Sequence, residues 1–303
     1  MAPGEIQQFP LEEEYKKRTG ISPEDTKELR QWLKTQPHLP EKYITDLDLI
    51  LAYHSCERST GVTKQVLDLH YTLRTLFTNF FRNRTFEAVE ATLKMCLLHP
   101  LPECTKEGYA IFYTHLVDYD PKLFVYQDAI KAALMLIDLW QYEEGTWPGF
   151  IIVVDFEGMN LGHLARIDLQ SLQQFLYYLQ ETMLVRLKGL HFNNAPSWID
   201  KLLMMMKPFM KKELMDLVGV HTAGSDTIKK HIPVEGLPKE CGGKYKTMKE
   251  CRDDVLNKVK ANVSYFANEH NKRVNESLRP GKPKTITDIF GGIEGSFKKL
   301  DID

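Results

Sequence analysis

The sequence predicts an α/β protein in which an all-helical N-terminal subdomain precedes a mainly parallel sheet with crossover helices. Three observations predict it: helical apolar spacing over the first hundred residues, strand-length apolar runs alternating with amphipathic helices after Pro102, and a further amphipathic helix from Met248. We therefore divide the chain into a helical subdomain at residues 1–100, an α/β domain at 101–247, and a C-terminal helix with a tail at 248–303.

The first hundred residues are expected to be helical throughout. Ser22 followed by Pro23 is a strong helix start, because serine caps free N–H groups and proline fits the first helical position. A second helix is expected to open after Pro40. A third is expected over residues 62–81, where apolar residues recur at helical spacing.

The middle of the chain alternates between strands and helices. Strand-length apolar runs lie at residues 109–116, 150–156 and 189–192, and helical spacing fills residues 124–142 and 169–183. Strands joined by long helices are typical of a parallel sheet, because a crossover must return the chain to the same end. The tail after Arg279 is expected to be either loose or strapped across the body by Phe290 and Phe297.

Charge and cysteine content narrow the possible functions. The chain has 39 Lys and Arg against 41 Asp and Glu, so we expect no nucleic-acid partner, because binding a phosphate backbone needs a cationic excess. The five cysteines lack CxxC spacing, which predicts neither a disulfide framework nor a zinc knuckle. Without a signal peptide or a bilayer-length apolar run, the sequence predicts a soluble, monomeric, cytoplasmic protein that associates with membranes only peripherally.

No pattern in the sequence predicts catalysis. Asp155 and Glu157 lie two apart at the end of a strand and would suit acid/base or metal chemistry, but an acidic strand-to-helix turn gives the same pattern. His163, His191 and His221 are scattered along the chain, and neither a GxSxG nor an HExxH motif is present. We therefore expect no enzyme, no metal site and no cofactor.

One expected helix is apolar on nearly every side. It follows Ser197 and carries Trp198, Ile199, Leu202, Leu203, Met204, Met205, Met206, Phe209 and Met210. Such a helix is either fully buried in the core or a lid that covers an apolar pocket in one state and touches a bilayer in another. Its flexible methionines, the expected hinge at Lys207 and Pro208, and the flanking lysines favour the lid.

Basic residues gather near this helix. Lys211 and Lys212 follow it, and Arg186 and Lys188 come just before the preceding strand. Any one of them is more often a solvated charge than part of a site. Together they predict a peripheral contact with anionic lipids or phosphoinositides.

Four segments carry motifs in a characteristic order. They are FIIVVDFEG at 150–158, LKGLHFNNAP at 187–196, KPFMKKEL at 207–214 and LPKECGG at 237–243. In this order and spacing the chain resembles the CRAL-TRIO family of lipid-binding proteins. The resemblance implies a three-helix N-terminal bundle and an α/β lipid-binding domain whose sheet floors a pocket, closed by the helical lid that starts near Ser197.

The resemblance also implies which residues line the pocket. Counted along the matched segments, these are Ile130, Ala133, Leu134, Ile137, Phe150, Val154, Phe175, Leu179, Met183, Leu187, Leu190, Ile199, Leu202, Met206 and Met210, and Tyr178 would add one polar group. Where related carriers have serine, this chain has Ala133 and Ile137, so the pocket is less polar. The expected ligand is a hydrophobic small molecule of tocopherol, retinoid, carotenoid, sterol or isoprenoid type.

The family's phosphoinositide contact is only partly retained. Arg186 and Lys188 match two of the family's basic positions. The two positions further along the gate segment fall on Glu213 and Leu217, although Lys211 and Lys212 lie close by.

Three hypotheses for the function follow. The first is a carrier that extracts a hydrophobic molecule from one membrane and delivers it to another through the gated lid. The second is a phosphoinositide-sensing adaptor whose pocket lipid is regulatory. The third is an enzyme on the same scaffold with Asp155 and Glu157 at its centre.

Overall fold

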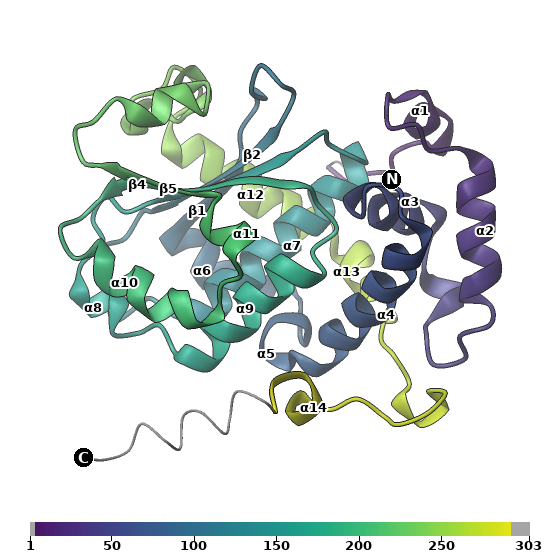
Figure 1. Ribbon diagram of the computed structural model, residues 1–303. Coiled ribbons are helices and arrows are strands. Elements are labelled where there is room, and N and C mark those ends of the chain that lie inside the picture. Colours follow the sequence, from purple (N-terminus) through teal and green to yellow (C-terminus); the bar gives the residue numbers. More distant parts are fainter. Residues whose placement is uncertain (1–3, 292–303) are drawn as a thin grey trace, which may run out of the picture.

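A five-stranded sheet forms the centre of the fold, and helices from both ends of the chain gather around it (Figure 1). The computed structural model describes residues 4–291. The N-terminal helices are α1 (Leu11–Lys16), α2 (Pro23–Leu33), α3 (Asp46–Ser55), α4 (Thr60–Leu76), α5 (Thr78–Phe81) and α6 (Phe86–Met95). The sheet region contains β1 (Cys96–Pro100), β2 (Ala110–Leu116), α7 (Tyr126–Glu144), β3 (Phe150–Asp155), α8 (Leu161–Leu164), α9 (Leu169–Glu181), β4 (Leu187–Ala195), α10 (Ile199–Met206), α11 (Lys212–Met215) and β5 (Val218–Thr222). The chain ends in α12 (Met248–Ala261), α13 (Val263–Glu269) and α14 (Ile286–Phe290).

The strands lie side by side in chain order, from β1 to β5. β1 is antiparallel to β2, and the other neighbouring strands are parallel, with α7 and α9 among the crossovers. Phe112, Ile152 and Leu190 are register partners across β2, β3 and β4, so their side chains share one face of the sheet. The mainly parallel α/β fold predicted from the sequence is confirmed.

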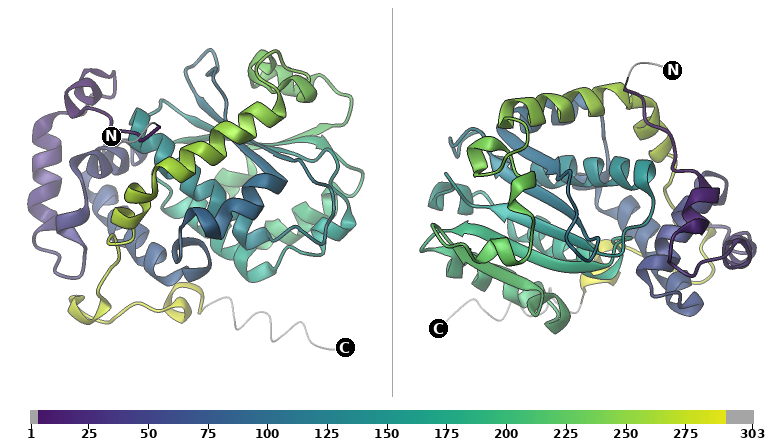
Figure 2. Two further views of the ribbon diagram at one scale, coloured as in Figure 1. Left: turned by 180° about the vertical axis from the view of Figure 1, so that it is seen from behind. Right: turned by 90° about the horizontal axis from the view of Figure 1, so that it is seen from above.

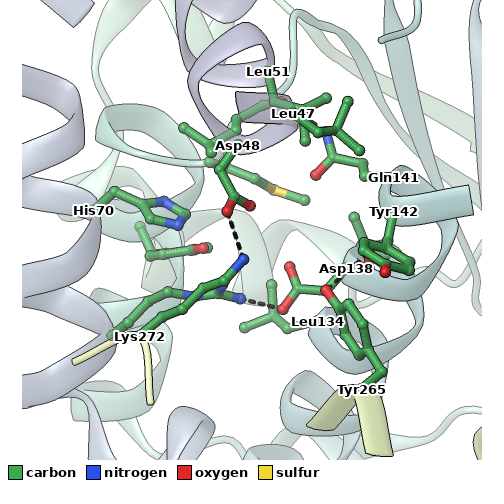
Figure 3. A pocket seen from close by; sticks show the side chains of 15 residues that line it. Leu47, Asp48, Leu51, His70, Leu134, Asp138, Gln141, Tyr142, Tyr265 and Lys272 are labelled. Carbon is green, nitrogen blue, oxygen red and sulfur yellow. Dashed lines mark hydrogen bonds and ion pairs between the residues drawn. The ribbon is translucent and has the colours of Figure 1, made fainter. Parts of the chain in front are cut away.

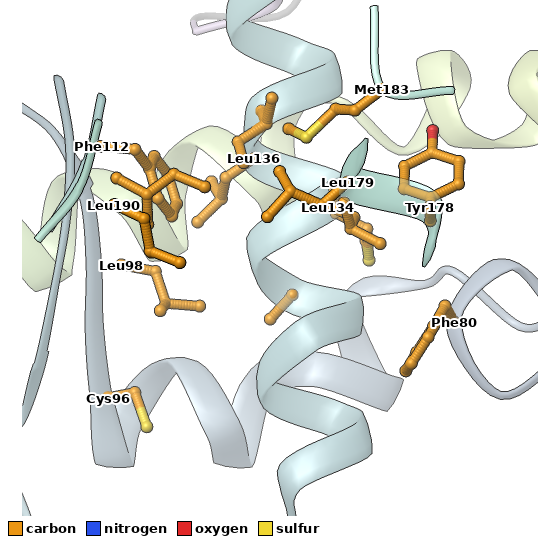
Figure 4. Close-up of a cluster of buried hydrophobic side chains, with 14 of the residues drawn as sticks. Phe80, Cys96, Leu98, Phe112, Leu134, Leu136, Tyr178, Leu179, Met183 and Leu190 are labelled. Carbon is orange, nitrogen blue, oxygen red and sulfur yellow. The ribbon is translucent and has the colours of Figure 1, made fainter. Parts of the chain in front are cut away.

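The two faces of the sheet have separate cores. Figure 4 shows Leu98, Phe112 and Leu190 reaching from the strands toward α7, with Phe80 and Tyr178 on the far side of that helix. The opposite face is covered by Ile228, Ile232 and Leu237 and by Cys251 of α12. The covering residues come from a segment of short turns, η3 (Thr227–Lys230), η4 (Val234–Gly236) and η5 (Lys239–Cys241). Each face can therefore hold a site independent of the other.

A buried ion network ties the N-terminal helices to the rest of the chain. The Arg84 Nη1 atom lies 2.7 Å from Asp138 Oδ2 on α7 and 2.9 Å from Glu269 Oε2 on α13. Arg74 of α4 pairs with the same two acids. Because a buried charge is costly without its partner, these four side chains fix the helical group against the sheet region. The left view of Figure 2 shows the yellow-green helices α12 and α13 running across the back of the molecule toward the N-terminal helices.

The chain after α13 lies against the N-terminal helices as a strap. Phe290 is 6% exposed, and its ring stacks on Phe77 with the ring centroids 5.9 Å apart. Arg279 and Lys284 both pair with Asp68 of α4, at 2.6 and 2.5 Å. The strapped alternative is confirmed for Phe290, whereas Phe297 lies outside the described residues.

Some helices and strands differ from those predicted from the sequence. The first hundred residues are not helical throughout, because the apolar run Cys96–Pro100 follows α6 without a break and forms β1. β5 was not predicted, since its short sequence VGVHT has few apolar residues. The second helix begins at Asp46, where Thr45 and Asp48 form a capping box, while Pro40 opens only a short 3₁₀ turn, η1 (Glu41–Tyr43).

Candidate functional site

A mostly apolar cavity of about 180 Å³ lies between the sheet and helices α7, α9 and α10. Its floor comes from Leu98, Phe112, Thr114, Ile152, Val154, Leu190 and Phe192 of four strands. Ile130 and Ala133 of α7 and Phe175 of α9 form its walls. Most of the lining offers no hydrogen-bond partner to replace water, so the cavity favours a mainly apolar molecule.

Helix α10 forms part of the wall of this cavity. Leu202 and Met206, about one turn apart, line it and are 6% and 4% exposed. Met204 lies between them and is 73% exposed, so the alternative of a fully buried core helix is wrong. At Lys207 the helix changes from α to 3₁₀ geometry, η2 (Lys207–Phe209), where the hinge was expected. α10 is thus a cover with an apolar underside and an exposed methionine on top.

Most of the residues expected to line the pocket do line this cavity. They are Ile130, Ala133, Leu134, Ile137, Val154, Phe175, Met183, Leu190, Leu202 and Met206. The remaining expected residues, Phe150, Tyr178, Leu179, Leu187, Ile199 and Met210, lie outside it.

Aromatic packing keeps two of these residues out of the cavity. Phe150 is fully buried and stacks on Trp147, with ring centroids 5.6 Å apart, so it closes the end of the sheet. Tyr178 was expected to supply a polar group to the ligand. It lies instead beyond α7, with its ring centroid 5.0 Å from that of Phe81 and 5.7 Å from that of His70 (Figure 4).

Local backbone geometry explains the other four misplaced residues. Leu179 and Leu187 line an open groove of about 460 Å³ between α4 and the α9 and β4 region. Leu187 is the register partner of Phe150 at the start of β4, and both lie outside the cavity, whereas Leu190 and its partner Ile152 line it. Ile199 is buried in the core at the first turn of α10, and the chain becomes extended at Met210, so neither continues the lining face of the helix.

Several lining residues were missed. Ile152 shares strand parity with Phe150 and Val154, so alternation alone would have found it. Leu98 belongs to the unpredicted strand β1 and had no such signal. Other missed residues come from segments that approach the cavity only once the tertiary fold has formed. They are Phe124, Tyr126, Met159, Ile167, Leu172 and Leu176.

The basic residues expected to bind phosphoinositides are partly neutralised. The Nη2 atom of Arg186 lies 2.9 Å from Glu57, and its Nε–H donates to the His54 carbonyl at 2.7 Å. Lys211 Nζ lies 2.5 Å from Glu181. Lys188 and Lys212 are exposed. The arrangement therefore offers less positive potential than the basic sequence pattern predicted.

Asp155 serves as a hydrogen-bond acceptor between strands. It is 3% exposed and accepts from the Tyr113 hydroxyl at 2.6 Å and from the Asn193 and Asn194 side-chain amides at 2.9 Å. Burial alone would raise the pKa of Asp155, but His115 and these donors hold it well below its usual range. Glu157 donates its backbone N–H to Asp155 and exposes its own side chain. Of the pair hypothesised for acid/base chemistry, Asp155 thus ties neighbouring strands together, and the side chain of Glu157 faces solvent.

A second, smaller chamber is lined by both polar and apolar side chains (Figure 3). Its volume is about 30 Å³, enough for one or two water molecules. Asp48 and Lys272 form an ion pair of 2.6 Å beside it, and His70 closes one side. The chamber is too small for a lipid and forms part of the boundary between subdomains.

Two of the three histidines that lie far apart in the sequence come together in the fold. His163 is fully buried, and its Nδ1 accepts the Asn160 backbone N–H at the start of α8. His191 and His221, far apart in the sequence, lie side by side with ring nitrogens 3.0 Å apart.

In comparison with known proteins, one family model matches the N-terminal helices and another matches the sheet region. Residues 94–243, which hold the sheet and the cavity, match the CRAL/TRIO domain. Residues 21–91, which hold α2 to α5 and most of α6, match a family described as Pinta-like, UBA domain. The chain therefore belongs to the CRAL-TRIO family of lipid-binding and lipid-transfer proteins.

Individual relatives are distant. Alpha-tocopherol transfer protein-like of Homo sapiens is 24% identical over 202 residues, which cover 66% of this chain and 54% of that protein. This chain thus spans about half the length of that relative. Clavesin-1 of Mus musculus is 22% identical over 248 residues, covering 80% of this chain and 69% of that one. A solved structure, the crystal structure of Sfh5, has a TM-score of 0.41 and 12% identity, covering 92% of this chain and 99% of Sfh5.

Within residues 4–291, no helix combines the length and the apolar character needed to cross a bilayer.

Proposed function

We propose that the chain binds one hydrophobic small molecule in the cavity under α10 and transfers it between membranes without covalent chemistry. The observation that supports this most is the mostly apolar cavity with Leu202 and Met206 of α10 in its wall. Burial of the cargo stabilises the complex by roughly 25 cal/mol per Å² of apolar surface removed from water. The cargo belongs to the tocopherol, retinoid, carotenoid, sterol or isoprenoid class.

The size of the cavity bears on how the cargo enters. A volume of about 180 Å³ is below the roughly 300–1,000 Å³ of typical ligand pockets. A long isoprenoid therefore requires lining side chains to move. Met159, Met183 and Met206 suit this movement, because the methionine side chain is unbranched and flexible. Loading then includes an outward shift of α10, hinged at Lys207.

Exposed apolar side chains surround the same end of the cavity. Leu161 of α8, Leu169 of α9 and Met204 of α10 are 49%, 47% and 73% exposed. Each lies two residues from one that lines the cavity: Met159, Ile167 and Leu202. Such side chains are well suited to inserting at the level of lipid headgroups and acyl chains. This surface is the proposed membrane contact, through which the cargo leaves the bilayer directly into the cavity.

The ion pairs favour a carrier over the phosphoinositide-sensing adaptor. Glu57 and Glu181 neutralise Arg186 and Lys211, and Glu213 lines the neighbouring groove. Each acid weakens attraction to an inositol phosphate, because like charges repel at short range. Transfer should therefore depend little on phosphoinositide in the acceptor vesicles, and a strict requirement for it would favour the adaptor.

Two methionines on α10 allow a matched test. Met206→Asp places a carboxylate in the apolar cavity and should abolish loading, measured by mass spectrometry of an organic extract of the purified protein. Met204→Asp places the same charge on the outer surface, so loading should persist while transfer between vesicles slows. Cargo retained by Met206→Asp would refute the cavity as the binding site. Unchanged transfer by Met204→Asp would refute membrane contact through α10.

A further inference from the structure

Three histidines meet on the face of the sheet opposite the cavity. The Nδ1 atom of His191 on β4 lies 3.0 Å from Nε2 of His221 on β5. The ring centroid of His231 is 4.5 Å from that of His191 and 5.3 Å from that of His221. One ring nitrogen from each residue lies within 4.8 Å of the other two.

Both strands and the covering segment build this arrangement. His191 lies between two cavity-lining residues of β4, so it points away from the cavity. His221 lies two residues beyond the register partner of His191, so it points to the same side. Ile228 and Ile232 are 6% and 3% exposed in the core of this face and hold His231 over the strands. The three rings thus come from three separately anchored segments.

Glycines leave the space that the rings occupy. A β-carbon at Gly219 would lie 2.3 Å from His191 Nδ1 and 3.1 Å from His221 Nε2. A β-carbon at Gly189 would lie 2.6 Å from His191 Nε2. Any larger residue at Gly219 would occupy the position between the two facing nitrogens.

We propose that His191, His221 and His231 form a binding site for a divalent transition-metal ion, with Zn²⁺ as the reference ion. Imidazole nitrogen suits Zn²⁺, Cu²⁺ and Ni²⁺. In tetrahedral zinc sites with Zn–N of 2.0–2.1 Å, two ligand nitrogens lie roughly 3.3 Å apart, close to the observed 3.0 Å. His231 is exposed, so a small ring movement completes the set and leaves a fourth position for water.

The remaining polar contacts support this assignment. His221 Nδ1 lies 2.8 Å from the Thr227 hydroxyl, so Nε2 is the ring nitrogen that faces the centre of the cluster. Metal-bound histidines commonly hold their second ring nitrogen in this way.

A hydrogen bond between His191 and His221 accounts for the shortest contact without a metal. The two explanations differ in what the isolated protein does. Metal binding must displace the proton shared by His191 and His221 and draw His231 toward them. A hydrogen bond between His191 and His221 alone does not involve His231. The site is also independent of the cargo, because it lies on the other face of the sheet.

The test is calorimetric titration of the 303-residue chain, freed of metal by a chelator, with Zn²⁺, and with Co²⁺ as a spectroscopic probe. We expect one Zn²⁺ per chain and the visible absorption of tetrahedral Co²⁺. Removing the hydrogen-bond partner of a metal ligand typically lowers metal affinity by roughly 10–100-fold. His231→Asn removes a ligand itself and should lower Zn²⁺ affinity by more than that. His270→Asn, a change at another exposed histidine, should leave the affinity unchanged.

Thr227→Val adds a readout at His221, since it removes the hydroxyl beside Nδ1 and should weaken Zn²⁺ binding by roughly 10–100-fold. Thermal unfolding without metal verifies that each variant is folded. Equal Zn²⁺ affinity in the wild type and the folded His231→Asn variant would overturn the proposal, as would the absence of any Zn²⁺ binding by the wild type.

Discussion

Filling the cavity from α7 should make the empty protein more stable and unable to load cargo. Ala133 lies on α7 in the cavity wall. At about 24 cal/mol per Å³, an empty cavity of about 180 Å³ costs about 4 kcal/mol. Phenylalanine adds roughly 100 Å³ to alanine, so Ala133→Phe recovers up to about 2 kcal/mol of stability if the ring fits the space.

Urea unfolding of delipidated protein, followed by tryptophan fluorescence, measures this gain, and mass spectrometry of an organic extract measures the bound cargo. Ala132→Phe is the matched control. Ala132 is 1% exposed in the close-packed core, so the same added volume should destabilise the fold by about 1–3 kcal/mol. If Ala133→Phe loses stability as Ala132→Phe does, or if it still carries cargo, the reasoning about the cavity is wrong.

Three further predictions concern the stability of the fold. Glu269→Gln should cost about 3–5 kcal/mol in urea unfolding, because it leaves the buried Arg84 short of negative charge; an unchanged midpoint would contradict this. Phe290→Ala should free the strap from Phe77 and speed tryptic cleavage near the C-terminus, with the circular dichroism of the body unchanged; equal cleavage rates would show that the strap does not depend on this ring. Lowering the pH from 6.5 to 5 should destabilise the fold, since burial, with Arg74 nearby, lowers the pKa of His70 to about 3 and only the unfolded chain takes up the proton in this range. This histidine contributes about 1.4 kcal/mol per pH unit below 6.5, so His70→Asn should show a shallower loss of stability, and identical slopes would refute its role.

Signals that act within a few residues predicted the elements well. Ser22 caps the start of α2 as expected, in a capping box with Asp25, and the apolar run at residues 150–156 forms β3. β1 was not predicted, because a run of five residues directly after a helix is too short to show an alternating apolar pattern. The order of the strands and the antiparallel edge depend on distant pairing and could not be predicted from local pattern.

The candidate site was predictable only in part, for a similar reason. Spacing and resemblance found Leu202 and Met206 on the underside of α10. They could not show that the next apolar neighbour of Tyr178 is a ring of the N-terminal subdomain rather than a ligand. Nor could a count of basic residues reveal that Arg186 is held by Glu57, because that ion pair exists only once α3 meets β4.

The buried ion network also orders events during synthesis of the chain. Arg74 and Arg84 leave the ribosome well before Asp138, and Glu269 follows long after Asp138. Until Glu269 is synthesised, the two guanidinium groups share the carboxylate of Asp138. The unpaired positive charge then opposes their burial in the interior. The N-terminal helices can form early, but their final docking must wait for α13. A ribosome stalled before residue 269 would therefore hold an open intermediate, exposed to proteases and chaperones.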